Sequence, residues 1–222
     1  MIKLYIVADR AVFSDEDAYF AVLAVLARSL GGYPAVALQV RAKEVTAAAR
    51  VPFVERVREA VGEYASRVFL NGTAREALAA GFGGVHWPET LIPQAPGLRP
   101  PGFTVGASVH SLAALKRAET AEVDFVLFGP VFDAGSKPVS GVGVSSLAEI
   151  VRHATVPVLA IGGVTPRNVP QCIDAGASGV AAVTGIVSAR NPAAAVADYL
   201  NAIEDAQRHL ATNGLTAPVH VS

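Results

Sequence analysis

The strongest constraint on the fold is a repeating pattern: short, almost entirely apolar runs alternate with longer, alanine-rich stretches whose apolar residues have helical spacing. Strands that are apolar on both faces are typical of a parallel sheet covered by helices. The runs predict strands at 2–8, 35–40, 67–70, 84–86, 103–107, 124–129, 158–161 and 179–183. The intervening stretches predict helices at 15–30, 44–64, 73–80, 112–121, 145–154, 167–175 and 192–210, with Pro52 as a candidate interruption of the second.

Eight strand–helix units in a chain of 222 residues fit a single (β/α)8 barrel, the TIM-barrel fold. We therefore expect one α/β domain over residues 1–210 and a disordered tail over residues 211–222. A doubly wound open sheet is the alternative fold. It gives no reason for polar residues at so many strand ends, and no G-x-G-x-x-G turn follows the first strand.

Composition narrows the classes of partner. The formal net charge of -1 provides no general attraction to nucleic acid. No apolar run approaches the ~20 residues of a membrane helix, and the first run is too short for a signal peptide. We therefore expect a cytoplasmic protein that acts on a small molecule. The single cysteine, Cys172, excludes a disulfide framework and a cysteine-rich zinc site within one chain.

Two glycine-punctuated turns follow the last two predicted strands. Gly162 and Gly163 end one strand, and Val183, Thr184 and Gly185 end the next. A glycine has no Cβ, so the backbone N–H groups around it can come close to a ligand. Two such turns at the ends of consecutive barrel strands indicate a phosphate-binding site.

Polar side chains also follow the earlier strands. Gln39, Arg41 and Lys43 alternate along one predicted strand and its exit, so they are expected on one face. A guanidinium fork and an ammonium together suit phosphate or diphosphate. The later predicted strands are followed by Asn71, by His86 and Glu89, by Ser108 and His110, and by a glycine-containing loop with Asp133, Ser136 and Lys137.

In order and spacing, several segments resemble thiamine phosphate synthase and its close relative, the TenI-like thiazole tautomerase. They are Gln39–Lys43, Gly83–His86, Val105–Ser111, Phe125–Phe132, Lys137, Ala160–Gly163 and Gly179–Ile186. The resemblance runs from about Leu4 to the last helix. It implies a barrel that acts on thiamine precursors, and a homodimer is a candidate assembly because the family is often dimeric.

The resemblance also implies roles for individual residues. The diphosphate or pyrimidine of a synthase would face Gln39, Arg41, Lys43, Asn71, Ser108 and Lys137. A small phosphorylated thiazole ligand would be held by Gly163, Val183 and Thr184, with Gly162 in the same turn and Ser136 supplying a loop hydroxyl.

The chain departs from the synthase pattern at its two magnesium ligands. The acid after the third strand is replaced by Gly72, and the acid shortly after His86 is absent, with Glu89 at a shifted position. These departures favour the tautomerase branch, which moves a proton without metal. The expected proton carriers are His110, His86 or Glu89, since the tautomerase histidine after the sixth strand is replaced by Pro130.

Three functions therefore follow as hypotheses. The first is a thiazole tautomerase-type isomerase that acts on a carboxylated thiazole phosphate and needs no cofactor. The second is a thiamine phosphate synthase, a transferase that joins hydroxymethylpyrimidine diphosphate to thiazole phosphate, releases diphosphate and needs Mg²⁺. The third is a non-catalytic binder or regulator of thiazole phosphate.

Overall fold

The computed structural model describes residues 1–94, 97, 99–133 and 140–212. Its strands form one closed, parallel barrel in which each strand pairs with the next and β8 pairs with β1. This confirms the predicted (β/α)8 barrel and its single domain. The strands are β1 (Leu4–Asp9), β2 (Val36–Arg41), β3 (Val68–Asn71), β4 (Gly84–Trp87), β5 (Thr104–Val109), β6 (Phe125–Phe128), β7 (Val158–Ala160) and β8 (Gly179–Ala182).

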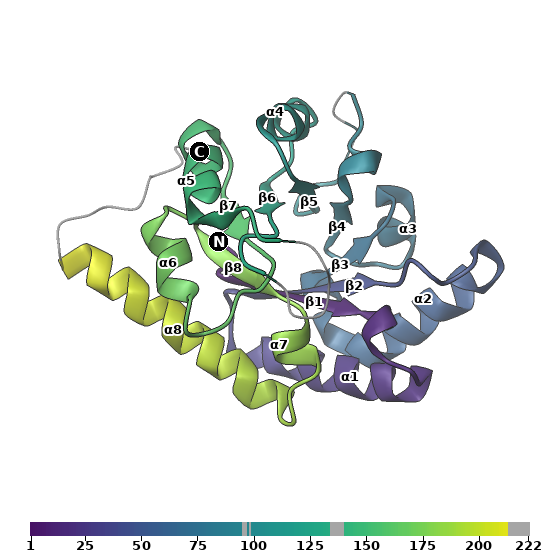
Figure 1. The fold of residues 1–222 in the computed structure, drawn as a ribbon. Coiled ribbons are helices and arrows are strands. Elements are labelled where there is room, and N and C mark those ends of the chain that lie inside the picture. Colours follow the sequence, from purple (N-terminus) through teal and green to yellow (C-terminus); the bar gives the residue numbers. More distant parts are fainter. Residues whose placement is uncertain (95–96, 98, 134–139, 213–222) are drawn as a thin grey trace.

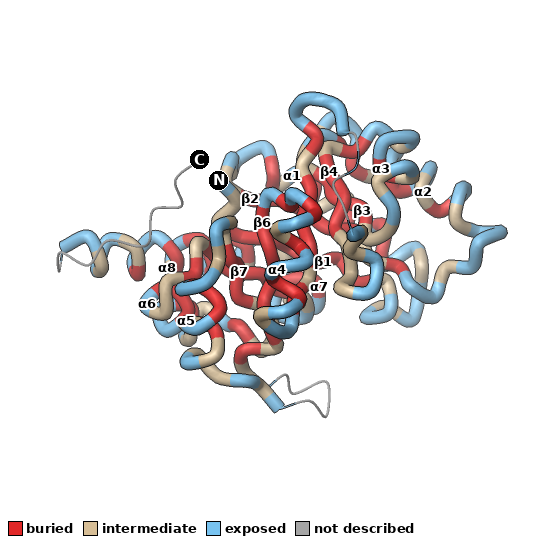
Figure 2. Tube along the Cα trace, turned by 90° about the horizontal axis from the view of Figure 1, so that it is seen from above, coloured by how far each residue is buried: buried red, intermediate tan, exposed pale blue. Residues whose placement is uncertain are grey.

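Helices surround the barrel, so buried strands lie inside and exposed helix faces lie outside (Figures 1 and 2). The α-helices are α1 (Glu16–Gly32), α2 (Ala47–Val61), α3 (Ala74–Ala79), α4 (Leu112–Thr120), α5 (Gly143–His153), α6 (Val169–Asp174), α7 (Thr184–Val187) and α8 (Pro192–Thr212). The short 3-10 helices are η1 (Arg10–Val12), η2 (Gly62–Arg67) and η3 (Glu89–Leu91). Among the described residues, no helix is both long enough and apolar enough to cross a membrane.

Three helical features differ from the sequence prediction. The short helix α7 was not predicted, because its four residues carry no helical periodicity. Pro52 does not interrupt α2, although it lies inside that helix. Proline has no N–H to donate to the carbonyl of Ala48, but Ala48 is exposed, so water can bond to that carbonyl. Helix α8 continues to Thr212, two residues past the predicted barrel limit, and the remaining predicted tail, 213–222, lies outside the described residues.

Aromatic rings fill the inside of the barrel. Tyr5 contacts Phe69 and Phe125 with ring centroids 5.4 Å and 5.2 Å away. Glycines make room for these rings: a Cβ at Gly84 would lie 2.5 Å from a ring atom of Phe69, and one at Gly106 would lie 2.3 Å from Cζ of Phe125. Large residues opposite small ones pack the interior without a pore.

His86 belongs to the same interior. Its ring lies 5.6 Å from the ring of Tyr5 and 6.0 Å from that of Phe125, centroid to centroid, and the residue is buried. Burial lowers the pKa of His86 to about 3, because the charged imidazolium would lose its hydration. The imidazole is therefore neutral at physiological pH.

The close contact between Gly106 and Phe125 can be tested by a double mutant. Gly106→Ala should lower the free energy of unfolding by about 1–3 kcal/mol, because the new methyl group overpacks the barrel. Phe125→Leu in the same background should recover part of that loss in urea unfolding. Gly32→Ala is the matched control, since a Cβ there meets nothing within 4 Å. Equal unfolding curves for Gly106→Ala and Gly32→Ala would contradict this packing.

The buried His86 predicts a dependence of stability on pH. An unfolded histidine has a pKa of about 6.5, so between about pH 6.5 and 3 the unfolded chain binds one more proton than the native chain. Stability is therefore lost as the pH falls through this window. From pH 7 to pH 5, the free energy of unfolding should drop by about 2 kcal/mol more in the wild type than in His86→Gln. The exposed His153→Gln should retain the wild-type drop, and equal drops in all three proteins would refute the prediction.

Candidate functional site

The candidate residues gather at one end of the barrel, since parallel strands end on the same side. Within strands lie Gln39, Arg41, Asn71, His86 and Ser108. In the segments that follow strands lie Lys43, Glu89, His110, Gly162, Gly163, Val183 and Thr184. Ser136 and Lys137 lie outside the described residues.

The basic set after β2 is only partly as predicted. Arg41 forms an ion pair with Asp9 at the end of the neighbouring strand β1. Gln39 is buried, and its side-chain oxygen has no hydrogen-bond partner among the described residues. Strand β2 ends at Arg41, so the alternation does not extend to Lys43, which is exposed. The two cations thus lie at one strand exit, and Arg41 is already oriented by a carboxylate that the sequence analysis did not single out.

Arg50 is a second residue that the sequence analysis missed. Its guanidinium donates to the carbonyls of Ala42 and Asn71, both at 3.1 Å, and pairs with Glu76 at 3.0 Å. These contacts join the exits of β2 and β3 from outside the barrel. No local pattern marks the residue, because its partners belong to two other segments of the chain.

A chain of hydrogen bonds connects β3, β4 and β5. The Asn71 side-chain amide donates to the His86 carbonyl at 3.3 Å, and His86 Nε2 lies 2.9 Å from Ser108 Oγ. His86 Nδ1 is buried without a partner among the described residues. Because His86 stays neutral, it fixes the Ser108 hydroxyl without carrying charge.

His110 and Glu89 form a separate set at the exits of β4 and β5. The Glu89 carboxylate accepts from the His110 backbone N–H at 3.0 Å and pairs with Arg117 at 2.9 Å. His110 Nδ1 lies 2.5 Å from the Gly129 carbonyl, so this nitrogen carries the proton and donates. The structure thus brings His110 and Glu89 together, and His86 lies apart, inside the barrel.

The described residues do not fit the two-carboxylate magnesium site of a synthase. Glu89 is already engaged by Arg117 and by the His110 N–H. A Cβ at Gly72 would lie 3.0 Å from both Arg50 Nη2 and Glu76 Oε2, so a carboxylate placed there would begin beside a guanidinium. Among the residues described, no three histidine, cysteine, aspartate or glutamate side chains are grouped to hold a metal ion.

The turn after β7 is sharply bent and closely packed. Gly162 and Gly163 have φ values of +94° and +62°, which disfavour a side chain. A Cβ at Gly162 would lie 2.5 Å from Cα of Pro130, and one at Gly163 would lie 2.6 Å from the Asp133 carbonyl oxygen. The backbone N–H groups of Val131 and Phe132 donate to the carbonyls of Ile161 and Gly162 at 2.9 Å and 3.0 Å.

These bonds leave a row of donors on the turn. Among the described residues, the N–H groups of Gly162, Gly163 and Val164 have no acceptor. The same holds for Thr184 and Gly185 at the start of α7. We call residues 162–164 and 183–185 the paired turns. Backbone N–H groups without a protein acceptor, on turns kept open by glycine, suit a phosphate group.

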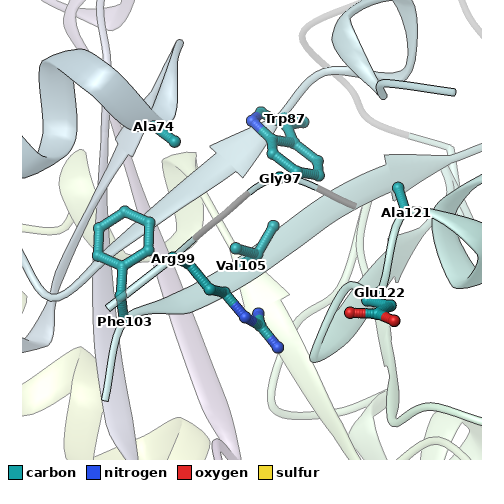
Figure 3. Close-up of a pocket in the computed structure, with 8 residues that line it drawn as sticks. All are labelled: Ala74, Trp87, Gly97, Arg99, Phe103, Val105, Ala121 and Glu122. Atoms are coloured by element: carbon teal, nitrogen blue, oxygen red, sulfur yellow. The ribbon is translucent and has the colours of Figure 1, made fainter. Parts of the chain in front are cut away.

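One cavity on the outside of the barrel is too small for such a ligand. This cavity, of about 40 Å³, is lined by Trp87 of β4 and Val105 of β5 (Figure 3). Neighbouring residues of a strand face opposite sides, and His86 and Gly106 face the barrel interior, so the cavity lies on the outer side of these strands. It is lined by Ala74, Trp87, Gly97, Arg99, Phe103, Val105, Ala121 and Glu122. Ligand pockets typically occupy several hundred Å³, so this cavity is too small for a phosphorylated heterocycle.

Comparisons with known proteins agree on the family. The family model described as thiamine monophosphate synthase matches residues 4–186. A putative thiamine-phosphate synthase of Geobacter sulfurreducens is 33% identical over 194 residues, which cover 86% of this chain and 89% of the relative. A thiamine-phosphate synthase of Methanoculleus marisnigri is 36% identical over 166 residues, 73% of this chain and 79% of the relative.

A solved structure agrees as well. Thiamine phosphate pyrophosphorylase from Pyrococcus furiosus superposes with a TM-score of 0.71 at 25% identity, and the match covers 92% of this chain and 96% of that one.

These relatives overturn the tautomerase prediction, which was wrong. It relied on Gly72 and on the missing second acid, yet the relatives that match over most of the chain are named as synthases. The better guide was Gly129-Pro130, which has the synthase pattern in place of the tautomerase histidine. The role of His110, His86 and Glu89 as proton carriers belongs to the tautomerase reaction and is not carried further. The chain is a member of the thiamine monophosphate synthase family.

Proposed function

We propose that this protein is a thiamine phosphate synthase, which joins hydroxymethylpyrimidine diphosphate to thiazole phosphate and releases diphosphate. The observation that carries the proposal is that two sets of groups suited to anions lie on one barrel rim. Arg41 and Lys43 follow β2, and the paired turns follow β7 and β8. Both substrates are anionic, so each set supports one of them. In the closed barrel only β1 lies between β8 and β2, so the two sets flank one side of the rim and leave its centre for the reacting atoms.

The pyrimidine side of the site is supported by polar groups at the inner strand ends. The Gln39 side-chain oxygen is buried without a partner among the described residues and can accept from the amino group of the pyrimidine. Ser108 is held by His86, and Asn71 by the His86 carbonyl. Fixed partners of this kind orient a substrate before reaction and so lower the entropy that must be lost in the transition state.

The leaving diphosphate gains negative charge as its bond to the pyrimidine methylene carbon breaks. Cations aimed at that charge stabilise the transition state more than the ground state. Arg41 supplies such a cation, and its ion pair with Asp9 fixes the guanidinium before substrate binds. The described carboxylates do not fit a magnesium site, so in this proposal the cationic side chains of the chain itself stabilise the leaving diphosphate.

A coupling assay tests the proposal directly. Purified protein, both substrates and magnesium should yield thiamine phosphate and diphosphate in equal amounts, measured by chromatography. Magnesium is included because substrate phosphates bind it. Tight binding of thiazole phosphate without product would favour the second candidate, a non-catalytic binder. The observation that favours that candidate is the loss of the two magnesium-binding acids of the synthase pattern, at Gly72 and after His86. A parallel assay without added metal shows how far the chain depends on it.

Neutralising the basic set should affect only one substrate. Arg41→Gln with Lys43→Gln should raise the KM for the pyrimidine diphosphate at least about tenfold, since each charge-assisted hydrogen bond contributes about 1.5–3 kcal/mol. The KM for thiazole phosphate should stay unchanged. Lys116→Gln with Arg152→Gln removes two exposed cations from the helices α4 and α5 as a matched control. If both pairs of substitutions shift both KM values alike, the basic set is only surface charge.

A further inference from the structure

Two side chains from outside the turn after β7 bind its remaining carbonyls. Asn168, the N-cap residue of α6, donates from Nδ2 to the Gly163 carbonyl at 3.0 Å and accepts from the Thr165 N–H at 2.7 Å. Tyr199 on α8 donates from its hydroxyl to the Val164 carbonyl at 2.8 Å. Both side chains therefore hold the backbone of the turn from the side of the helices α6 and α8.

These bonds fix the orientation of two peptide groups in the turn, one of which carries a free N–H. In a planar trans peptide the C=O and N–H groups point in opposite directions. The Gly163 carbonyl shares a peptide with the Val164 N–H, so the bond from Asn168 turns that N–H away from α6. The Val164 carbonyl shares a peptide with the Thr165 N–H, so the bond from Tyr199 directs that N–H toward Asn168. Tyr199 thus fixes the peptide whose N–H bonds to Asn168, and Asn168 fixes the peptide that carries the free Val164 N–H.

Tyr199 also contacts the second of the paired turns. A Cβ at Gly185 would lie 2.3 Å from the Tyr199 hydroxyl oxygen and 3.3 Å from Cζ, so glycine is required there. Tyr199 is buried, with 1% of its surface exposed. Burial raises the pKa of the phenol to about 12, so the hydroxyl keeps its proton and remains a donor. One side chain thereby spaces the turn after β7 from the turn after β8.

We propose that Tyr199 and Asn168 are positioning residues for the phosphate of the thiazole substrate: Asn168 binds the Gly163 carbonyl and so aims the free Val164 N–H at the anion, and Tyr199 binds the Val164 carbonyl and so holds the Thr165 N–H that fixes Asn168. The inference rests on the proposed function for the identity of the substrate. The positioning role itself depends only on an anion binding at the paired turns, whichever substrate carries that anion.

Tyr199→Phe removes the hydroxyl and keeps the ring. Inorganic phosphate is titrated into the labelled protein, and the amide NMR signals of Gly162, Gly163 and Val164 report binding. The Kd for phosphate should rise about three- to tenfold, the value of one buried hydrogen bond. The Kd for the thiazole alcohol, which lacks the phosphate, should stay unchanged. Tyr19→Phe is the matched control, because that buried hydroxyl bonds to the Ala8 carbonyl, at 3.4 Å, on β1.

Asn168→Asp provides a second variant at a half-buried position. The carboxylate can still accept from Thr165 but cannot donate to Gly163, so phosphate binding should weaken at least as much. Phosphate affinity equal to wild type in both variants, or no response of the three amides in the wild type, would overturn the inference. Normal phosphate effects without any coupling activity would support the inference and contradict the proposed synthase function alone.

Discussion

Closure of the barrel is the constraint on which the rest of this structure depends. Each strand is hydrogen-bonded to two neighbours, and β8 returns to β1, so no strand edge is left open. Closure is possible only if the interior is filled without strain. Tyr5, Phe69 and Phe125 occupy the centre, and Gly84 and Gly106 give them the space. Since all strands are parallel, closure also places eight carboxyl ends on one rim.

That rim carries two kinds of hydrogen-bond donor. On the β2 side, the donors are charged side chains. Asp9 orients Arg41, and its negative charge offsets part of the positive potential of the guanidinium. On the side of β7 and β8, the donors are backbone N–H groups, which need no charge but must be pointed correctly. The carbonyls of the first turn are all bonded from outside, two of them by the side chains of Asn168 and Tyr199. Helices α6 and α8 therefore fix the backbone of this turn.

The error about the reaction has a physical origin. Gly72 and the shifted Glu89 remove a metal site from the sequence, and metal-free chemistry is the simplest reading of that loss. In the structure, Arg50 and Glu76 pair with each other and occupy the space beside Gly72. Loss of a metal ligand therefore does not by itself identify a different reaction. Similarity over most of the chain outweighed two positions.

The sequence by itself determined the barrel, the order of its strands and the ends at which polar residues gather. These follow from local hydrophobic periodicity and from the rule that parallel strands share their carboxyl ends. Gly162 and Gly163 likewise marked the turn, because residues with a side chain rarely adopt the positive φ angles that the turn requires. Only the tertiary structure decided which partners complete the site. Asp9 meets Arg41, and Tyr199 meets Val164, across 32 and 35 positions of the chain, a separation at which no periodic pattern carries information.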